Sequence, residues 1–137
     1  MADIFLSYSH HDGESLKNIF GALAERGVSV WSDQEIRAGN EWMPEIEKAL
    51  AEAKVFVLCL SPSFLASDWA QLEIGVALSR SRDSGVRVIP LILRESVVPH
   101  ALKRFQWVDA RKMLPNEVAA AIQKVVEESK LKPFAHP

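Results

Sequence analysis

The chain has 137 residues, of which 48% are hydrophobic and 25% charged, and its formal net charge is -2. This length fits one domain, and this balance of residues excludes disordered and fibrous proteins. Because so small a net charge provides no broad basic face, we expect no nucleic-acid partner.

The longest apolar run, residues 55–60, is too short to span a membrane or to form the core of a signal peptide. We expect a cytoplasmic protein with no membrane partner, and secretion into a host cell as an effector is the alternative. Cys59 lies within this run and is predicted to be a buried apolar residue rather than a catalytic thiol. The histidines lack metal-ligand spacing, so we predict no metal site; they are His10, His11, His100 and His136.

The first third of the chain predicts a strand, a helix and a second strand. Residues 3–9 begin as an apolar run and end in hydroxyl residues, which is typical of a central parallel strand that opens into a loop. A helix is predicted over residues 13–26, with Asp12 as its N-cap and Gly27 as its C-terminal cap. Residues 28–31 form a short second strand.

A long polar loop, residues 33–39, separates the second strand from the next helix. Asn40 is a suitable N-cap for that helix. Its buried positions are predicted to be Ile46, Ala49, Leu50 and Ala53. Residues 55–60 then form a third strand that is apolar throughout, and we expect both of its faces to be covered.

Ser61, Pro62 and Ser63 end the third strand, and a further helix begins at Ser67 or Asp68, either of which is a good N-cap. The fourth strand covers residues 87–93. Within it, Pro90 removes one amide donor and indicates a locally irregular ladder. Residues 95–104 are predicted to be a loop with a short helical turn, residues 105–109 a fifth strand, and residues 115–130 a last helix.

Strand and helix alternate along the whole chain, which predicts an α/β fold with a parallel sheet and helices on both faces. Ligands of such sheets bind beyond the carboxyl ends of the strands, where the strand order reverses. The polar residues expected at this edge are Ser7, Tyr8, Ser9, His10, Asp33, Ser61 and Ser63. Hydrogen bonding at the strand ends is the alternative role for Tyr8 and the serines.

Glu73 is unusual because the helix that carries it is otherwise apolar around it. Its neighbours three and four residues away are Trp69, Ala70, Val76 and Ala77. A carboxylate in such surroundings has the character of many catalytic carboxylates. The alternative is a glutamate at the edge of the helix, with its carboxylate in solvent or paired with Arg37 or Arg87. Trp69 lies one turn before Glu73 and either lines the same crevice or anchors the helix in the core.

Several segments resemble the Toll/interleukin-1 receptor (TIR) domain. Residues 5–9, Phe-Leu-Ser-Tyr-Ser, resemble its first signature box, and residues 33–42 resemble the loop and helix start after its second strand. Residues 61–73 resemble the end of its third strand, followed by its Trp-x-x-x-Glu motif with Trp69 and Glu73. Residues 105–107 look like a loosened Phe-Trp box. The resemblance implies that residues 1–130 form a TIR domain and that residues 131–137 are a tail or the start of a linker.

This resemblance implies a flavodoxin-like sheet of five parallel strands in the order 2-1-3-4-5. For members with this glutamate, it implies cleavage of NAD at the bond between nicotinamide and ribose, with NAD as substrate and no other cofactor. Glu73 is then the catalytic residue, and both hydrolysis and cyclisation remain open. The residues that would bind NAD are Trp69, Tyr8, Ser9, His10 and Asp33.

By the same resemblance, one loop contacts a neighbouring TIR domain, so that self-association completes the site. That loop contains Gln34, Glu35, Ile36, Arg37 and Gly39. It lacks the proline typical of adaptor-type animal TIR domains and resembles bacterial forms, which favours a role in bacterial immune-type signalling, NAD depletion or virulence.

Two other functions fit a related fold. The first is a TIR scaffold without catalysis, which serves only homotypic binding. The second is an enzyme similar to nucleoside deoxyribosyltransferases, which use a glutamate at a ribosyl carbon. A phospho-receiver domain is disfavoured, because the third strand ends in Ser61 where a phosphorylatable aspartate is required.

Overall fold

The structure, a computed structural model, describes residues 2–32 and 52–131. In chain order the elements are β1 (Ile4–Ser7), η1 (His10–Asp12), α1 (Gly13–Glu25), β2 (Val30–Ser32), β3 (Val55–Leu60), α4 (Pro62–Leu65), α5 (Asp68–Ser84), β4 (Arg87–Ile92), η2 (His100–Leu102), β5 (Val108–Asp109), η3 (Ala110–Lys112) and α6 (Pro115–Leu131). The helix predicted after Asn40 lies outside the described residues up to residue 51.

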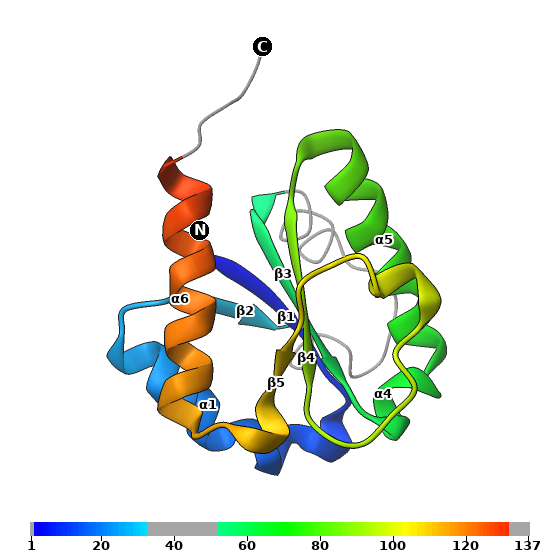
Figure 1. Cartoon of the computed structure of the whole chain (residues 1–137), viewed down its shortest axis with the longest axis horizontal. Helices are drawn as coiled ribbons and strands as arrows, with labels where there is room; N and C mark the ends of the chain where they lie inside the picture. The colour runs from blue at the N-terminus through cyan, green and yellow to red at the C-terminus, as the bar shows by residue number, and fades with distance from the viewer. Residues whose placement is uncertain (1, 33–51, 132–137) are drawn as a thin grey trace.

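The strands form one parallel sheet in the order β2-β1-β3-β4-β5, which confirms the predicted fold. Helices α1 and α6 cover one face, and α4 and α5 cover the other (Figure 1). The chain runs outward from β1 to β2 and then returns to the other side of β1 to form β3. The strand order therefore reverses between β1 and β3, which is where such sheets bind ligands.

Two hydrophobic layers, one on each face of the sheet, make up the core. Leu16 of α1 and Ile122 of α6 pack on one face, and Phe64 of α4 and Ile74 of α5 pack on the other. All six residues of β3 are buried, as its apolar sequence predicted. On the α5 face, Phe5 stacks against Trp31 and Phe56, with ring centroids 5.0 and 5.4 Å apart.

The structure corrects several predicted details. Pro90 does not disturb the ladder, because β3 and β4 stay in continuous register from the pair Val55 and Arg87 to the pair Leu60 and Ile92. The fifth strand is only Val108–Asp109 instead of residues 105–109, and it pairs with Leu91 and Ile92 alone. The second strand begins at Val30, two residues later than predicted.

Ser61 is the N-cap of α4, a short helix that was not expected from the sequence. Its hydroxyl accepts a hydrogen bond from the N–H of Phe64, and Pro62 takes the first position of α4. The longer α5 starts at Asp68, as predicted. The last helix, α6, continues to Leu131, one residue beyond the predicted end.

Two glycines, one within α1 and one after its end, provide a matched test of the local backbone. Gly27 follows the helix with a φ of 76°, which disfavours any side chain. Gly21 lies inside the helix, and a Cβ added there meets nothing within 4 Å. We expect Gly27→Ala to lower the free energy of unfolding by about 1 kcal/mol and Gly21→Ala to raise it by about 0.5–1 kcal/mol. Urea unfolding measures both, and a stabilised Gly27→Ala would contradict the cap.

Candidate active site

Glu73 and Ser7 form a buried polar contact at the carboxyl edge of the sheet. The hydroxyl of Ser7 donates a hydrogen bond to Oε1 of Glu73, and neither residue has exposed surface. Ser7 is the last residue of β1, and Glu73 lies in the first half of α5. A strand end and a helix far apart in the sequence thus hold one carboxylate at the point where the strand order reverses.

The alternation of side chains along β1 explains why Ser7 faces α5. Phe5 packs in the layer beneath α5, whereas Ile4 and Leu6 pack in the layer beneath α1 and α6. Two residues beyond Phe5, the side chain of Ser7 returns to the α5 face. A serine at this position therefore places a hydroxyl donor in the layer beneath α5, which Phe5 otherwise fills with an apolar side chain.

The structure also bears on the alternative role of Glu73. The alternative that places its carboxylate in solvent is wrong, because Glu73 is 0% exposed. Pairing with Arg87 is also wrong, because Arg87 pairs with Glu128 across 3.3 Å. Arg37 lies outside the described residues.

A second buried carboxylate, Asp12, lies at the same edge. Asp12 is 1% exposed. Ser61 donates to its Oδ2 at 2.5 Å, and Nε of Arg94 donates to its Oδ1 at 3.1 Å. Arg94 also donates to the hydroxyl of Ser15 across 3.1 Å. These bonds join the chain segments that follow β1, β3 and β4.

Asp12 was predicted to cap α1, but its side chain makes other hydrogen bonds. Asp12 stands at the N-cap position of α1, but its side chain makes no capping hydrogen bond. The carboxylate turns instead to Ser61 and Arg94, because both offer donors in the buried edge of the sheet.

Cys59 is buried, as predicted, and it lies near both carboxylates. Burial raises the pKa of its thiol well above the usual range, and the negative charges of Asp12 and Glu73 raise it further. The thiol therefore stays protonated near neutral pH and is a poor nucleophile.

A cavity of about 210 Å³ opens beside this edge, between the segment after β1 and α4. Three predicted substrate-binding residues, Tyr8, Ser9 and His10, meet in its wall. The hydroxyl of Ser9 accepts a bond from the N–H of His11 at 3.2 Å, and the ring of Tyr8 packs edge-on against Phe20 with centroids 5.6 Å apart. These two residues thus also have a structural role.

Glu73 does not line this cavity. Several predicted residues cannot be placed beside it: Asp33 and the loop residues Gln34, Glu35, Ile36, Arg37 and Gly39 lie outside the described residues, as does the side chain of Trp69. Ser7 was expected at this edge but had no predicted role in the site, and Asp12 and Arg94 were not among the predicted site residues. The two-residue alternation after Phe5 indicates the orientation of Ser7, but no local pattern indicates the contact between Asp12 and Arg94.

Within residues 2–32 and 52–131, no three His, Cys, Asp or Glu side chains are grouped so that they could hold a metal ion. No helix in the same residues is long and apolar enough to cross a membrane.

The sequence matches the TIR-domain family over residues 4–126, so the chain belongs to this family. The chain is 25% identical over 130 residues to the 2' cyclic ADP-D-ribose synthase BtTIR of Bacteroides thetaiotaomicron, covering 93% of this chain and 45% of that protein. It is 24% identical over 127 residues to the NAD(+) hydrolase TcpA of a Theionarchaea archaeon, covering 91% of this chain and 36% of that protein. The chain therefore spans less than half the length of both relatives.

The fold is also that of solved TIR domains. The TIR domain of the Toll-related receptor TRR-2 from Hydra magnipapillata superposes with a TM-score of 0.72 and 19% sequence identity, covering 95% of this chain and 99% of that domain. At this level of identity, the similarity establishes the arrangement of strands and helices and leaves the chemistry to the site residues.

Arg94 offers a test of the polar contacts around Asp12. Arg94→Gln removes the charged donor from a buried carboxylate, and we expect it to lower the free energy of unfolding by about 1–2 kcal/mol, since the arginine itself is half exposed. Arg82→Gln is the matched control: its side chain is 71% exposed and pairs only with its neighbour Asp83, so we expect a loss below about 0.5 kcal/mol. Equal losses in the two variants would contradict a structural role for the Asp12 pair.

Proposed function

We propose that this chain is a TIR-domain NAD+ nucleosidase and that Glu73 is its catalytic carboxylate. The observation that carries the proposal is the buried contact between Glu73 and Ser7 at the carboxyl edge of the sheet. Two relatives whose names state NAD hydrolysis or cyclic ADP-ribose synthesis, at 24% and 25% identity, support it. The NAD-binding residues of the proposal are Tyr8, Ser9, His10, Trp69 and Asp33.

A single carboxylate is sufficient for this reaction. The bond between C1 of the ribose and the ring nitrogen of nicotinamide breaks, and its electron pair leaves with the nitrogen. Nicotinamide is cationic in NAD and departs neutral, so no acid has to protonate it, unlike the leaving groups of ordinary glycosidases. Positive charge develops on the ribose, and a fixed carboxylate beside it stabilises the transition state more than the ground state.

Ser7 contributes by holding that carboxylate. Its hydroxyl donates to Oε1 of Glu73, so it fixes the side chain in one orientation. This serves electrostatic catalysis, because a carboxylate that is already oriented needs no rearrangement as charge develops. Ser7 is therefore a positioning residue in this proposal.

The nucleophile that completes the reaction determines the product. Attack of water at C1 of the ribose gives ADP-ribose and releases a proton. Attack by a group of the substrate's own nucleoside gives a cyclic isomer of ADP-ribose. Both outcomes use the same departure of nicotinamide, so the proposal assigns this first step to Glu73 and includes both products.

Glu73 has no exposed surface, so substrate reaches it only after a rearrangement. We assign this opening to self-association through the loop of Gln34, Glu35, Ile36, Arg37 and Gly39. A site completed by a neighbouring copy would make activity depend on how many copies are gathered. Such control fits a role in bacterial immune-type signalling, NAD depletion or virulence.

A second candidate function is a TIR scaffold for homotypic binding without catalysis. The complete burial of Glu73 favours it, since a buried glutamate bonded to Ser7 is also compatible with a purely structural role. The match to the TIR family leaves the deoxyribosyltransferase alternative without a supporting observation.

Glu73→Gln tests the catalytic assignment. This change keeps an acceptor for Ser7 and removes the charge, so we expect the wild type to release nicotinamide from NAD and the variant to lose at least about 100-fold in kcat. Chromatography of nicotinamide, ADP-ribose and cyclic products measures the rate and identifies the product. Glu127→Gln, on the exposed side of α6, is the control and should retain full activity.

Turnover that survives both Glu73→Gln and Glu73→Ala would show that another group is catalytic. Ser7→Ala should reduce kcat by about tenfold, because the carboxylate loses the donor that orients it. Ser7→Thr, which restores a hydroxyl, should recover part of this loss. A wild type that releases no nicotinamide, even when crowded, would favour the scaffold.

The dependence on assembly gives a separate prediction. The rate of nicotinamide release per molecule should rise with protein concentration over about 1–100 µM and rise further when tagged protein is clustered on vesicles. Glu73→Gln under the same clustering provides the background. A rate per molecule that stays constant would show that one copy holds the complete site.

A further inference from the structure

The edge of β4 is largely uncovered by the neighbouring strand. β5 pairs only with Leu91 and Ile92, so Arg87, Val88 and Ile89 have no partner strand on that side among the described residues. The N–H of Arg87 donates to the C=O of Lys54, the residue before β3, and the N–H of Leu93 donates to the C=O of Leu60 in β3. Successive residues of a strand alternate in direction. The N–H and C=O of Val88 therefore face away from β3, toward this edge.

A pocket of about 510 Å³ lies along this edge, between α5 and α6. Its volume is within the range of small-molecule sites. The floor is apolar and consists of Val86, Val88, Ile89, Val108, Ala121 and Val125. Two aromatic residues, Phe105 and Trp107, add flat surfaces, and Trp107 is 45% exposed. Such a floor and walls suit a flat ring.

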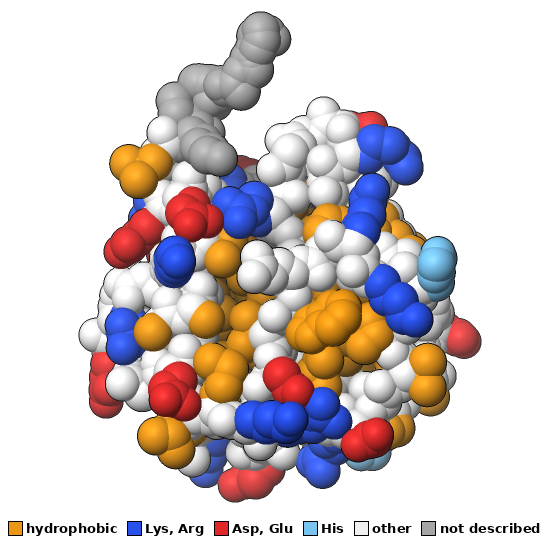
Figure 2. Space-filling view, in the orientation of Figure 1, with side chains coloured by type: hydrophobic (Ala, Val, Ile, Leu, Met, Phe, Trp, Pro, Cys, Tyr) orange, Lys and Arg blue, Asp and Glu red, His pale blue; other side chains and the backbone are white. Residues whose placement is uncertain are grey.

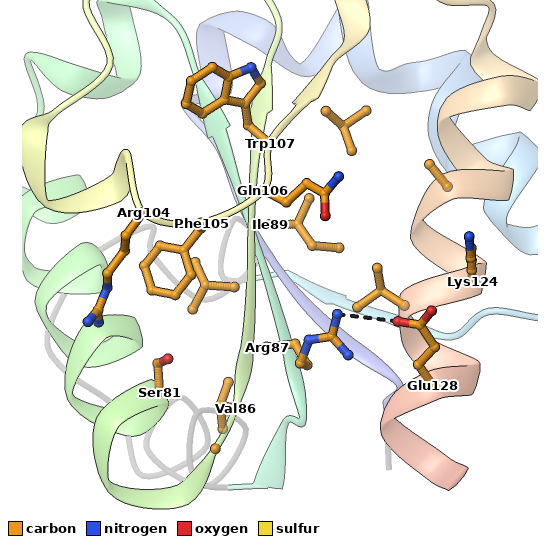
Figure 3. A pocket seen from close by; sticks show the side chains of 15 residues that line it. Ser81, Val86, Arg87, Ile89, Arg104, Phe105, Gln106, Trp107, Lys124 and Glu128 are labelled. Carbon is orange, nitrogen blue, oxygen red and sulfur yellow. Dashed lines mark hydrogen bonds and ion pairs between the residues drawn. The ribbon is translucent and has the colours of Figure 1, made fainter. Parts of the chain in front are cut away.

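The charged side chains of the pocket are mainly cationic. Arg87, Arg104 and Lys124 line it, and Glu128, which pairs with Arg87 at 3.3 Å, is its one carboxylate. Figure 3 shows Arg104 and Phe105 on one side of β4, and Lys124 and Glu128 of α6 on the other. Arg104 also lies 4.7 Å from the centroid of the Phe105 ring. In Figure 2, hydrophobic side chains gather in the middle of this face, with Lys and Arg side chains around them.

We propose that this pocket is a second binding site, distinct from the edge that carries Glu73, and that its ligand is a nucleotide: a heteroaromatic ring joined to a phosphate. The ring would lie on the apolar floor against Trp107, and its edge would meet the N–H and C=O of Val88. The phosphate would lie toward Lys124, since ammonium groups bind phosphate oxygens with charge-assisted bonds.

The three features select this class of ligand together. An uncharged aromatic compound makes no ionic contact with the cations, and inorganic phosphate leaves the apolar floor exposed to water. The strand edge supplies one donor and one acceptor side by side, which matches the paired acceptor and donor on the edge of a nucleobase. The inference is independent of the proposed reaction, because no lining residue belongs to the proposed active site.

Titration of the full chain with adenosine monophosphate, followed by calorimetry and by amide chemical shifts, tests the proposal. Adenosine and inorganic phosphate serve as the two fragments. We expect the nucleotide to bind at least about tenfold more tightly than either fragment, with an affinity that falls as salt is added. The largest shifts should fall on Val88, Trp107 and the pocket side of α6.

Two variants separate the parts of the ligand. Lys124→Gln should weaken the nucleotide about five- to tenfold and leave adenosine unchanged, because only the phosphate contact is lost. Trp107→Leu should weaken both about equally. Lys17→Gln, on α1 with a side chain 75% exposed, is the matched control and should change neither. Thermal unfolding of each variant verifies that it is folded.

Three results would overturn the proposal. The first is no binding at about 10 mM nucleotide. The second is an affinity that is the same in the wild type, Lys124→Gln and Trp107→Leu, which would place the nucleotide elsewhere, including the Glu73 edge. The third is broadening of the pocket amides with rising protein concentration and no response to nucleotide, which would assign this face to contact with a second copy of the chain.

Discussion

The complete burial of β3 is the constraint on which the rest of the structure depends. This strand is central, pairs along its length with β4 and over four residues with β1, and has both faces covered by helices. None of its six side chains has exposed surface, so none of them can be charged without a large loss of stability. Buried polar groups are thereby confined to the ends of the strands, and among the described residues they lie at the carboxyl edge: Ser7, Ser9, Asp12, Ser61 and Glu73.

Two carboxylates at that edge are accommodated in different ways. Asp12 receives a hydroxyl from Ser61 and a guanidinium from Arg94, so its charge is balanced within the fold. Glu73 receives the hydroxyl of Ser7 on one of its oxygens. The bonds of Asp12 join three chain segments, whereas the bond between Ser7 and Glu73 fixes the orientation of the carboxylate that is proposed to act on the substrate.

Features with a local cause could be predicted from the sequence. The apolar run of residues 55–60 and the N-cap at Ser67 or Asp68 predicted β3 and α5 closely, because each depends on neighbours in the chain. Contacts between distant segments were not predictable: Asp12 fits the local pattern of a cap, yet its partners lie 49 and 82 residues away. The length of β5 was also not predictable. The extent of a strand depends on where it pairs with its neighbour, and the sequence of residues 105–107 does not indicate that these residues are unpaired.

The bare edge of β4 has a consequence for solubility. A sheet that ends in unpaired backbone groups can recruit a strand from another molecule, and repeated recruitment leads to aggregates. Pro90 occupies this edge and has no N–H, so an incoming strand would miss a hydrogen bond near the middle of the interface. Arg104 and Lys124 lie beside this edge and would repel the same two cations of a second copy that approached edge to edge. The proposed gathering of many copies at high local concentration could in this way take place without fusing their sheets into a fibre.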